Sequence, residues 1–129
     1  METKQLTSAL KAKMTNKNMN SKDFNEIVLR RLDLVEDTLT KKAAEYAVND
    51  NRLHNFDKAA AFTGKSREEC LWGMALKHLV SVTDIIDKVS VGQLPSKHLL
   101  DEKIGDLINY LCLLEVSITD KIEKNERVD

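Results

Sequence analysis

The sequence is poor in the residues that make turns. Its 129 residues include four glycines and one proline, and aromatic side chains make up 5% of the chain. A β-sandwich or barrel needs many turn residues between short strands, so this composition argues against both. With 42% apolar and 32% charged residues, the chain has the composition of one soluble, helical domain.

Long apolar runs and a strong net charge are also missing. No stretch approaches the roughly 18 apolar residues of a membrane span, and "METKQLTSALKAKM" lacks the apolar run of a signal peptide. We therefore expect a cytoplasmic protein without a membrane partner. The net charge of −1 gives no general attraction for a nucleic-acid polymer. Cys70 and Cys112 fall inside apolar helical patterns, which favours buried free thiols over a disulfide.

Residues 1–22 are polar, and we expect them to form an arm that packs on the body or on a neighbouring subunit. A helix over about 23–48 follows, capped by Ser21 or Asp23. Its apolar residues recur at helical spacing and form one stripe: Val28, Leu32, Val35 and Leu39.

A short helix over about 54–62 is predicted to end at Gly64, because glycine favours the left-handed conformation that closes a helix. "SREE", with Ser66 and Glu69, is a capping box that begins a helix running to about residue 89. Its predicted core seam is Leu71, Ala75, His78, Val82, Ile85 and Val89.

The last predicted helix covers about 97–124 and leaves 125–129 as a flexible tail. Its predicted core seam is Leu100, Ile104, Leu107, Leu111, Leu114, Ile118 and Ile122. The sequence therefore predicts an all-α, mostly antiparallel bundle of three long helices and one short one. Because "YLCLL" (110–114) is apolar around the whole helix circumference, we also expect a homo-oligomer.

Polar residues form two rows that interrupt these apolar helices. Spacings of four and three place Glu102, Asp106 and Asn109 on one face, beside Tyr110. The preceding helix carries a matching row beside His78, made of Lys77, Ser81, Asp84 and Lys88. One interpretation is that these rows form a solvated face. The other is that they face a ligand, since buried carboxylates need cations or donors as partners.

A third group of polar residues lies in "NDNRLHNFDK". Arg52, His54, Asn55 and Lys58 offer donors to an anion, and Phe56 offers a stacking surface. The alternative is that Arg52 and Lys58 are ordinary surface charges.

At "EKIGDLINYL" the chain resembles the MazG-like family, the all-α nucleoside triphosphate pyrophosphohydrolases, and in particular phage-type members with a "D..NY" helix. The resemblance covers roughly 23–123 and also rests on "KAAEYA…RLHNF" and "WGMALKHLVSVTD". It implies a MazG-like bundle in which acids of two helices, Glu-x-x-Glu and Glu-Glu-x-x-Asp, hold Mg²⁺ on a triphosphate.

The chain departs from this family pattern at the metal ligands. "EKIGD" keeps Glu102 and Asp106 but has Lys103 where a glutamate is expected, and "KHLVS" has Lys77, His78 and Ser81 in place of acids. Asp84 matches an acid one turn further on. Positive charges oppose a metal cluster but suit phosphate oxygens.

Two functions from different classes follow. In the first, the protein binds a linear or cyclic nucleotide without hydrolysing it and uses no cofactor, and the phage-type resemblance suggests a protein that sequesters a host-defence signal. Phosphates would contact Arg52, Lys77, His78 and Lys103, with His54 and Ser81 as further donors. Glu102, Asp106 or Asn109 would contact base or ribose, and Tyr110 or Phe56 would pack on the base.

In the second, the protein is a Mg²⁺-dependent pyrophosphohydrolase. Its metal ligands would be Glu45, Asp84, Glu102 and Asp106. A helical interaction module without a small ligand is a third possibility.

Overall fold

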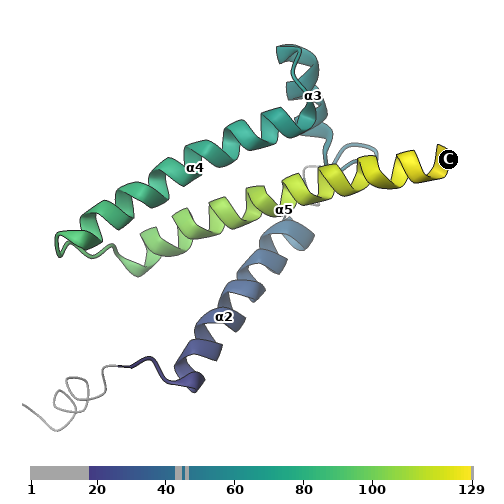
Figure 1. Cartoon of the computed structure of the whole chain (residues 1–129). Coiled ribbons are helices and arrows are strands. Elements are labelled where there is room, and N and C mark those ends of the chain that lie inside the picture. The colour runs from purple at the N-terminus through teal and green to yellow at the C-terminus, as the bar shows by residue number, and fades with distance from the viewer. Residues whose placement is uncertain (1–17, 43–44, 46, 129) are drawn as a thin grey trace, which may run out of the picture. The chain divides into compact units, whose positions relative to one another are not determined.

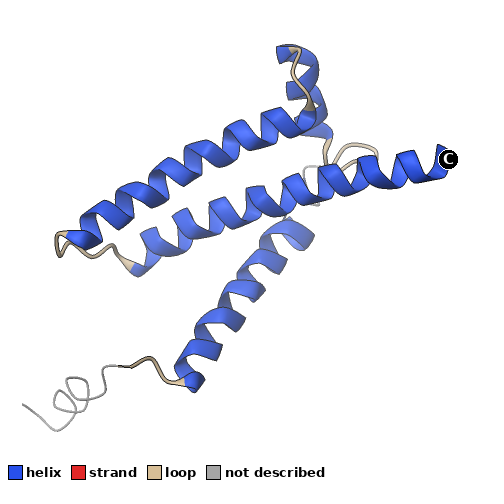
Figure 2. Cartoon of the chain, viewed as in Figure 1, coloured by secondary structure: helices blue, strands red, loops and turns tan. Residues whose placement is uncertain are grey.

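The computed structural model describes residues 18–42, 45 and 47–128. Within these residues every regular element is a helix, as Figure 2 shows, and the only strand-like pairing is an isolated bridge between Val48 and Asn51. The predicted all-α class is confirmed. Most of the predicted arm, residues 1–17, lies outside the described residues.

The chain divides into two compact units, Met1–Leu32 and Asp33–Asp129. Helix α2 (Ser21–Glu36) spans the boundary and is followed by a π-helical turn, η2 (Asp37–Lys42). The sequence predicted Ser21 or Asp23 as the cap of α2, but the cap is Asn20, whose Oδ1 accepts a hydrogen bond from the Asp23 backbone N–H at 2.8 Å. Asparagine caps helices as well as serine or aspartate does.

The second unit contains the remaining helices. They are α3 (His54–Thr63), α4 (Arg67–Ser90) and α5 (Lys97–Val128). Gly64 closes α3 in the left-handed region at φ 71°, and Ser66 with Glu69 forms the predicted capping box of α4. Helix α5 continues to Val128 instead of ending near residue 124.

Helices α4 and α5 form an antiparallel hairpin, in which the two long ribbons of Figure 1 lie side by side. The predicted seam of α4 faces α5: Leu71, Ala75 and Ile85 are buried, and His78 contacts α5. This seam is confirmed along most of its length, although Val89 at the end of the helix is 44% exposed.

The predicted core seam of α5 is wrong. The residues that contact α4 include Asp106, Tyr110 and Ser117, and each of them precedes a residue of the predicted seam by one position. Of the predicted seam, four residues are exposed: Leu100, Leu111, Ile118 and Ile122. Asp106 and Ser117 can face α4 because α4 supplies a partner for each, His78 for Asp106 and Arg67 for Ser117.

Each face of the hairpin therefore has its own chemistry. We call the residues through which the two helices touch the contact row. In an antiparallel pair, the residues that follow the contact row by one position, on either helix, lie on one face of the hairpin. The residues that precede it by one position lie on the opposite face. The positions before the contact row include Lys77, Ser81, Asp84, Glu102 and Asn109, and we call this the polar side. The positions after it are mostly apolar.

Candidate functional site

An aromatic and ionic cluster joins the three helices of the second unit. The His78 ring stacks on Tyr110 with centroids 4.9 Å apart and planes 19° from parallel. Phe56 meets Tyr110 edge to face at 6.4 Å between centroids. His78 Nδ1 lies 3.6 Å from Asp106 Oδ2, so the carboxylate can pair with the imidazole when that ring is protonated. The predicted ligand groups His78, Asp106 and Tyr110 thus contact one another.

Asn109, one turn from Asp106, carries an unsatisfied polar atom. Its Oδ1 is buried and has no hydrogen-bond partner. A buried carbonyl oxygen without a donor is unfavourable by about 1–3 kcal/mol, so such atoms are uncommon in folded proteins. A donor from a bound molecule would satisfy it.

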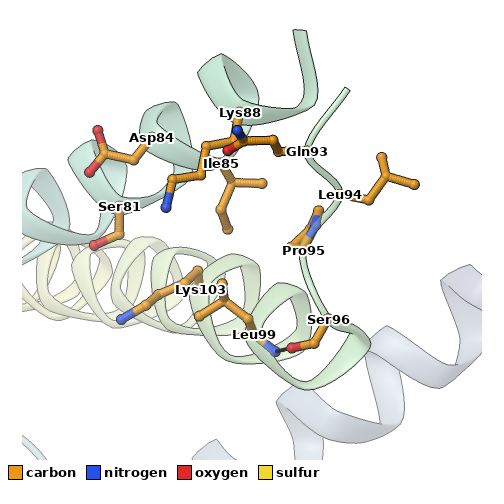
Figure 3. Close-up of a pocket in the computed structure, with 10 residues that line it drawn as sticks. All are labelled: Ser81, Asp84, Ile85, Lys88, Gln93, Leu94, Pro95, Ser96, Leu99 and Lys103. Carbon is orange, nitrogen blue, oxygen red and sulfur yellow. Dashed lines mark hydrogen bonds between the residues drawn. The ribbon is translucent and has the colours of Figure 1, made fainter. Parts of the chain in front are cut away.

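A cleft of about 450 Å³ opens where α4 turns into α5, and we call it the hairpin cleft. Its polar lining includes Ser81, Asp84, Lys88 and Lys103, and Figure 3 shows both lysines extending toward the Ser81 side. The rest of its wall is more apolar and comes from both helices and the connecting turn: Ile85, Leu94, Pro95 and Leu99.

The turn places two further polar residues, Gln93 and Ser96, in the lining of this cleft. Ser96 precedes the first residue of α5, and its Oγ accepts a hydrogen bond from the Leu99 backbone N–H at 3.0 Å. The cleft therefore lies beside the amino end of α5, whose dipole favours negative charge, and beside the carboxyl end of α4, whose dipole favours positive charge.

The charges of the hairpin cleft favour an anion. Two ammonium groups, on Lys88 and Lys103, face one carboxylate, on Asp84. Lys103 Nζ also lies 3.5 Å from Glu102 Oε1, an exposed carboxylate outside the lining. The Lys103 side chain is only partly exposed.

Four of the predicted phosphate contacts lie outside this cleft, and one of them is His78, which contacts Tyr110 and lies near Asp106. Arg52 donates to the backbone carbonyls of Leu39 at 3.1 Å and Thr40 at 3.2 Å, so it holds the end of η2. His54 is the first residue of α3. Lys77 lies on the polar side, one turn before Ser81, and is exposed.

The structure does not assemble the acids of the pyrophosphohydrolase hypothesis into a group. Asp84 lines the hairpin cleft, and Glu45 is exposed. Asp106 lies beside His78, and Glu102 lies within 4 Å of both Lys103 and His98. Among the residues that the structure describes, no group of three or more potential ligands is placed to hold a metal ion.

Sequence analysis missed the densest charge network of the second unit. Arg67 donates to Asp57 at 3.1 Å, to Asp120 at 3.0 Å and, through Nε, to Ser117 Oγ at 2.6 Å. The fully buried Ser117 in turn donates to Glu68, which also pairs with Lys121. Arginine in the first turn of a helix is disfavoured by the helix dipole, and this was the available signal that Arg67 has acidic partners.

The network shifts the pKa values of its members. Hydrogen bonds from Asn51 and Arg67 hold the pKa of Asp57 below its usual value, and those from Lys124 and Arg67 do the same for the pKa of Asp120. Burial opposes ionisation of Glu68, but hydrogen bonds from Lys121 and Ser117 outweigh it and lower its pKa. The network therefore joins α3, α4 and α5 through ionised groups and is structural.

Two observations bear on the membrane and on relatives. No helix among the described residues is long and apolar enough to cross a membrane. No protein-family model, curated protein or solved structure matches the chain. The MazG-like resemblance thus stays a prediction from the sequence.

Proposed function

We propose that the protein binds a phosphate-bearing nucleotide in the hairpin cleft and holds it without hydrolysing it. The observation that supports this most directly is the pairing of Lys88 and Lys103 across a cleft that also has an apolar wall. Ammonium groups suit phosphate oxygens, and an apolar wall suits the face of a base.

The phosphate would lie between the two lysines. Lys88 comes from the last turns of α4 and Lys103 from the second turn of α5, and Ser81 adds a hydroxyl on the same side (Figure 3). Each charge-assisted hydrogen bond of this kind contributes about 1.5–3 kcal/mol.

The base would pack against the apolar wall formed by Ile85, Leu94 and Leu99. The volume of about 450 Å³ falls within the range of small-molecule sites, roughly 300–1,000 Å³, and suits a mononucleotide. A longer or cyclic dinucleotide would extend along the polar side, because Lys77 lies one helical turn from Ser81 on that side. It would then approach Asn109, whose buried oxygen needs a donor.

Binding without hydrolysis follows from the charges around the cleft. Lys88 and Lys103 repel a divalent cation that would bridge carboxylates to phosphate, whereas they neutralise phosphate directly. A protein that binds tightly and does not turn over would suit the sequestering role that the phage-type resemblance implies.

Titration calorimetry with linear and cyclic nucleotides, with Mg²⁺ and with EDTA, tests this proposal. We expect binding that EDTA leaves unchanged, with the intact nucleotide recovered by mass spectrometry. Pyrophosphate release that EDTA abolishes would instead favour the pyrophosphohydrolase, and absence of binding across the panel would refute both.

Matched variants locate the site. Lys88→Gln and Lys103→Gln should each weaken binding by about 10- to 100-fold, the equivalent of one charge-assisted hydrogen bond. Lys97→Gln is the control, because Lys97 is an exposed lysine of α5 that does not line the cleft. Equal affinities of Lys103→Gln and Lys97→Gln would show that the hairpin cleft is not the site.

A further inference from the structure

The side of the hairpin opposite the polar side is apolar and open. On α4, the exposed apolar residues one position after the contact row are Trp72, Leu76, Leu79 and Ile86, and the polar Thr83 lies between the last two. On α5 they are Leu100, Leu111, Ile118 and Ile122. These apolar residues are between 38% and 56% exposed, and we call the surface they form the outer face.

The outer face is as large as the largest apolar patches that monomers expose. From Leu100 to Ile122 its α5 row extends about 33 Å, and two adjacent helices are about 20 Å wide. The flat area is then on the order of 600 Å², at the upper limit of what monomers expose. Accessible area exceeds flat area, so the outer face approaches the roughly 800 Å² that each partner buries in a stable interface.

The spacing of the outer face favours helices as its partner. Its α5 row repeats at intervals of four and three through Leu100, Ile104, Leu107, Leu111 and Leu114, without a charged residue. This is the pattern of a seam that packs against another helix in knobs-into-holes fashion.

A second copy of the chain fits this surface better than α2 does. Helix α2 has 16 residues and is about 24 Å long, so it is shorter than the α5 row, and a single helix is narrower than a two-helix face. A second hairpin has the same length, width and spacing. A twofold axis would place each outer face on the other, as in the isologous dimers that are common among soluble proteins.

We propose that two copies pair through their outer faces and form a four-helix bundle from two α4–α5 hairpins. The hairpin cleft opens on the polar side, so both clefts of the dimer stay accessible. This proposal is independent of nucleotide binding, and either can fail without the other.

Sedimentation equilibrium over a range of concentrations tests the proposal on the full chain. We expect a species of twice the 14.6 kDa chain mass. A wild-type protein that is monomeric at high concentration would refute it, and would be the outcome if α2 of the same chain covers the outer face.

Ile118→Glu and Val116→Glu provide a matched pair on α5. Both residues are apolar and about half exposed, but Val116 lies before the contact row and Ile118 after it. Ile118→Glu should weaken dimerisation at least about 100-fold, because a carboxylate would be buried without a partner, and Val116→Glu should leave it unchanged. Unchanged helical circular dichroism in both variants shows that folding is retained. Equal dimerisation of the two variants would overturn the proposal.

Discussion

His78 of α4 lies flat against Tyr110 of α5, with ring centroids 4.9 Å apart. Asp106 Oδ2 lies 3.6 Å from Nδ1 of the same imidazole, and Phe56 of α3 meets the Tyr110 ring at 79°. One aromatic side chain on α5 therefore contacts both α4 and α3. The predicted ligand row of α5 is at the same time part of the contact between the helices.

A double-mutant cycle measures this contact. His78→Leu, Tyr110→Leu and the double variant should give a coupling energy of about 0.5–1.5 kcal/mol from urea unfolding, the usual value for a stacked aromatic pair. Tyr110→Phe keeps the ring and should change stability by less than about 0.5 kcal/mol. A coupling energy near zero would show that the two rings do not interact in solution.

Asn109 should separate stability from binding. Its buried Oδ1 lacks a donor, so Asn109→Leu, which is similar in size, is expected to leave the free energy of unfolding unchanged or to raise it. If a ligand supplies the donor, the same change should weaken nucleotide binding by about tenfold. Thermal melting and calorimetry on one preparation provide both values. A clear loss of stability would mean that Asn109 already has a partner, such as an ordered water.

Ser117 should be the most sensitive serine of the described chain, because it is fully buried and links Arg67 to Glu68. Ser117→Ala should lower the free energy of unfolding by about 1–3 kcal/mol, since two charged groups lose a hydrogen bond. Ser90→Ala is the control, because Ser90 is exposed and bonds only the Ile86 carbonyl of its own helix. Similar losses in the two variants would show that the Arg67 network contributes little.

Acid should weaken the same network. The pKa values of Asp57, Glu68 and Asp120 are lowered in the folded state, so their contribution to stability is complete above their usual pKa values, near 4. It is lost as the pH falls through the lowered folded values, because the folded state then takes up protons less readily than the unfolded chain.

Asp120→Asn should therefore show a smaller fall in melting temperature between pH 7 and pH 3 than the wild type, as followed by circular dichroism. Asp87→Asn, at an exposed position of α4, should behave like the wild type. If Asp120→Asn loses as much stability in acid as the wild type, Asp120 does not contribute to the acid sensitivity.

The end of α3 and the start of α4 were predictable because their signals are local. Gly64, Ser66 and Glu69 specify a cap within a few residues, and the structure shows each of them in that role. The end of α2 was placed too late, because nothing in the sequence distinguishes the η2 turn from a continuing helix. Arg52 was predicted to contact a phosphate or to be an ordinary surface charge, but it bonds carbonyls that this early end exposes.

The face that α5 presents to α4 was not predictable from apolar periodicity. The outer face of α5 has more apolar residues than the face that contacts α4, which contains Asp106 and Ser117. The apolar pattern therefore favoured the wrong face. Those residues can face α4 only because His78 and Arg67 lie opposite, and that pairing between distant segments is absent from a one-dimensional pattern. The same limit applies to the hairpin cleft. Ser81 and Lys103 were predicted as ligand residues, but only the fold shows that they line one cleft together with Lys88 and the turn.

Two glycines should respond to alanine with opposite signs. Gly64 has φ 71°, where a β-carbon is strained, so Gly64→Ala should lower the free energy of unfolding by about 1 kcal/mol. Gly73 lies inside α4, and a β-carbon there meets no atom within 4 Å, so Gly73→Ala should raise it by up to about 1 kcal/mol. Urea unfolding of the two variants beside the wild type measures both changes, with concentration held constant in case the chains associate. Gly64→Ala tests the backbone conformation at a helix end, whereas Gly73→Ala tests whether the space beside α4 is open. A loss of stability in Gly73→Ala would indicate that another surface packs against α4 there.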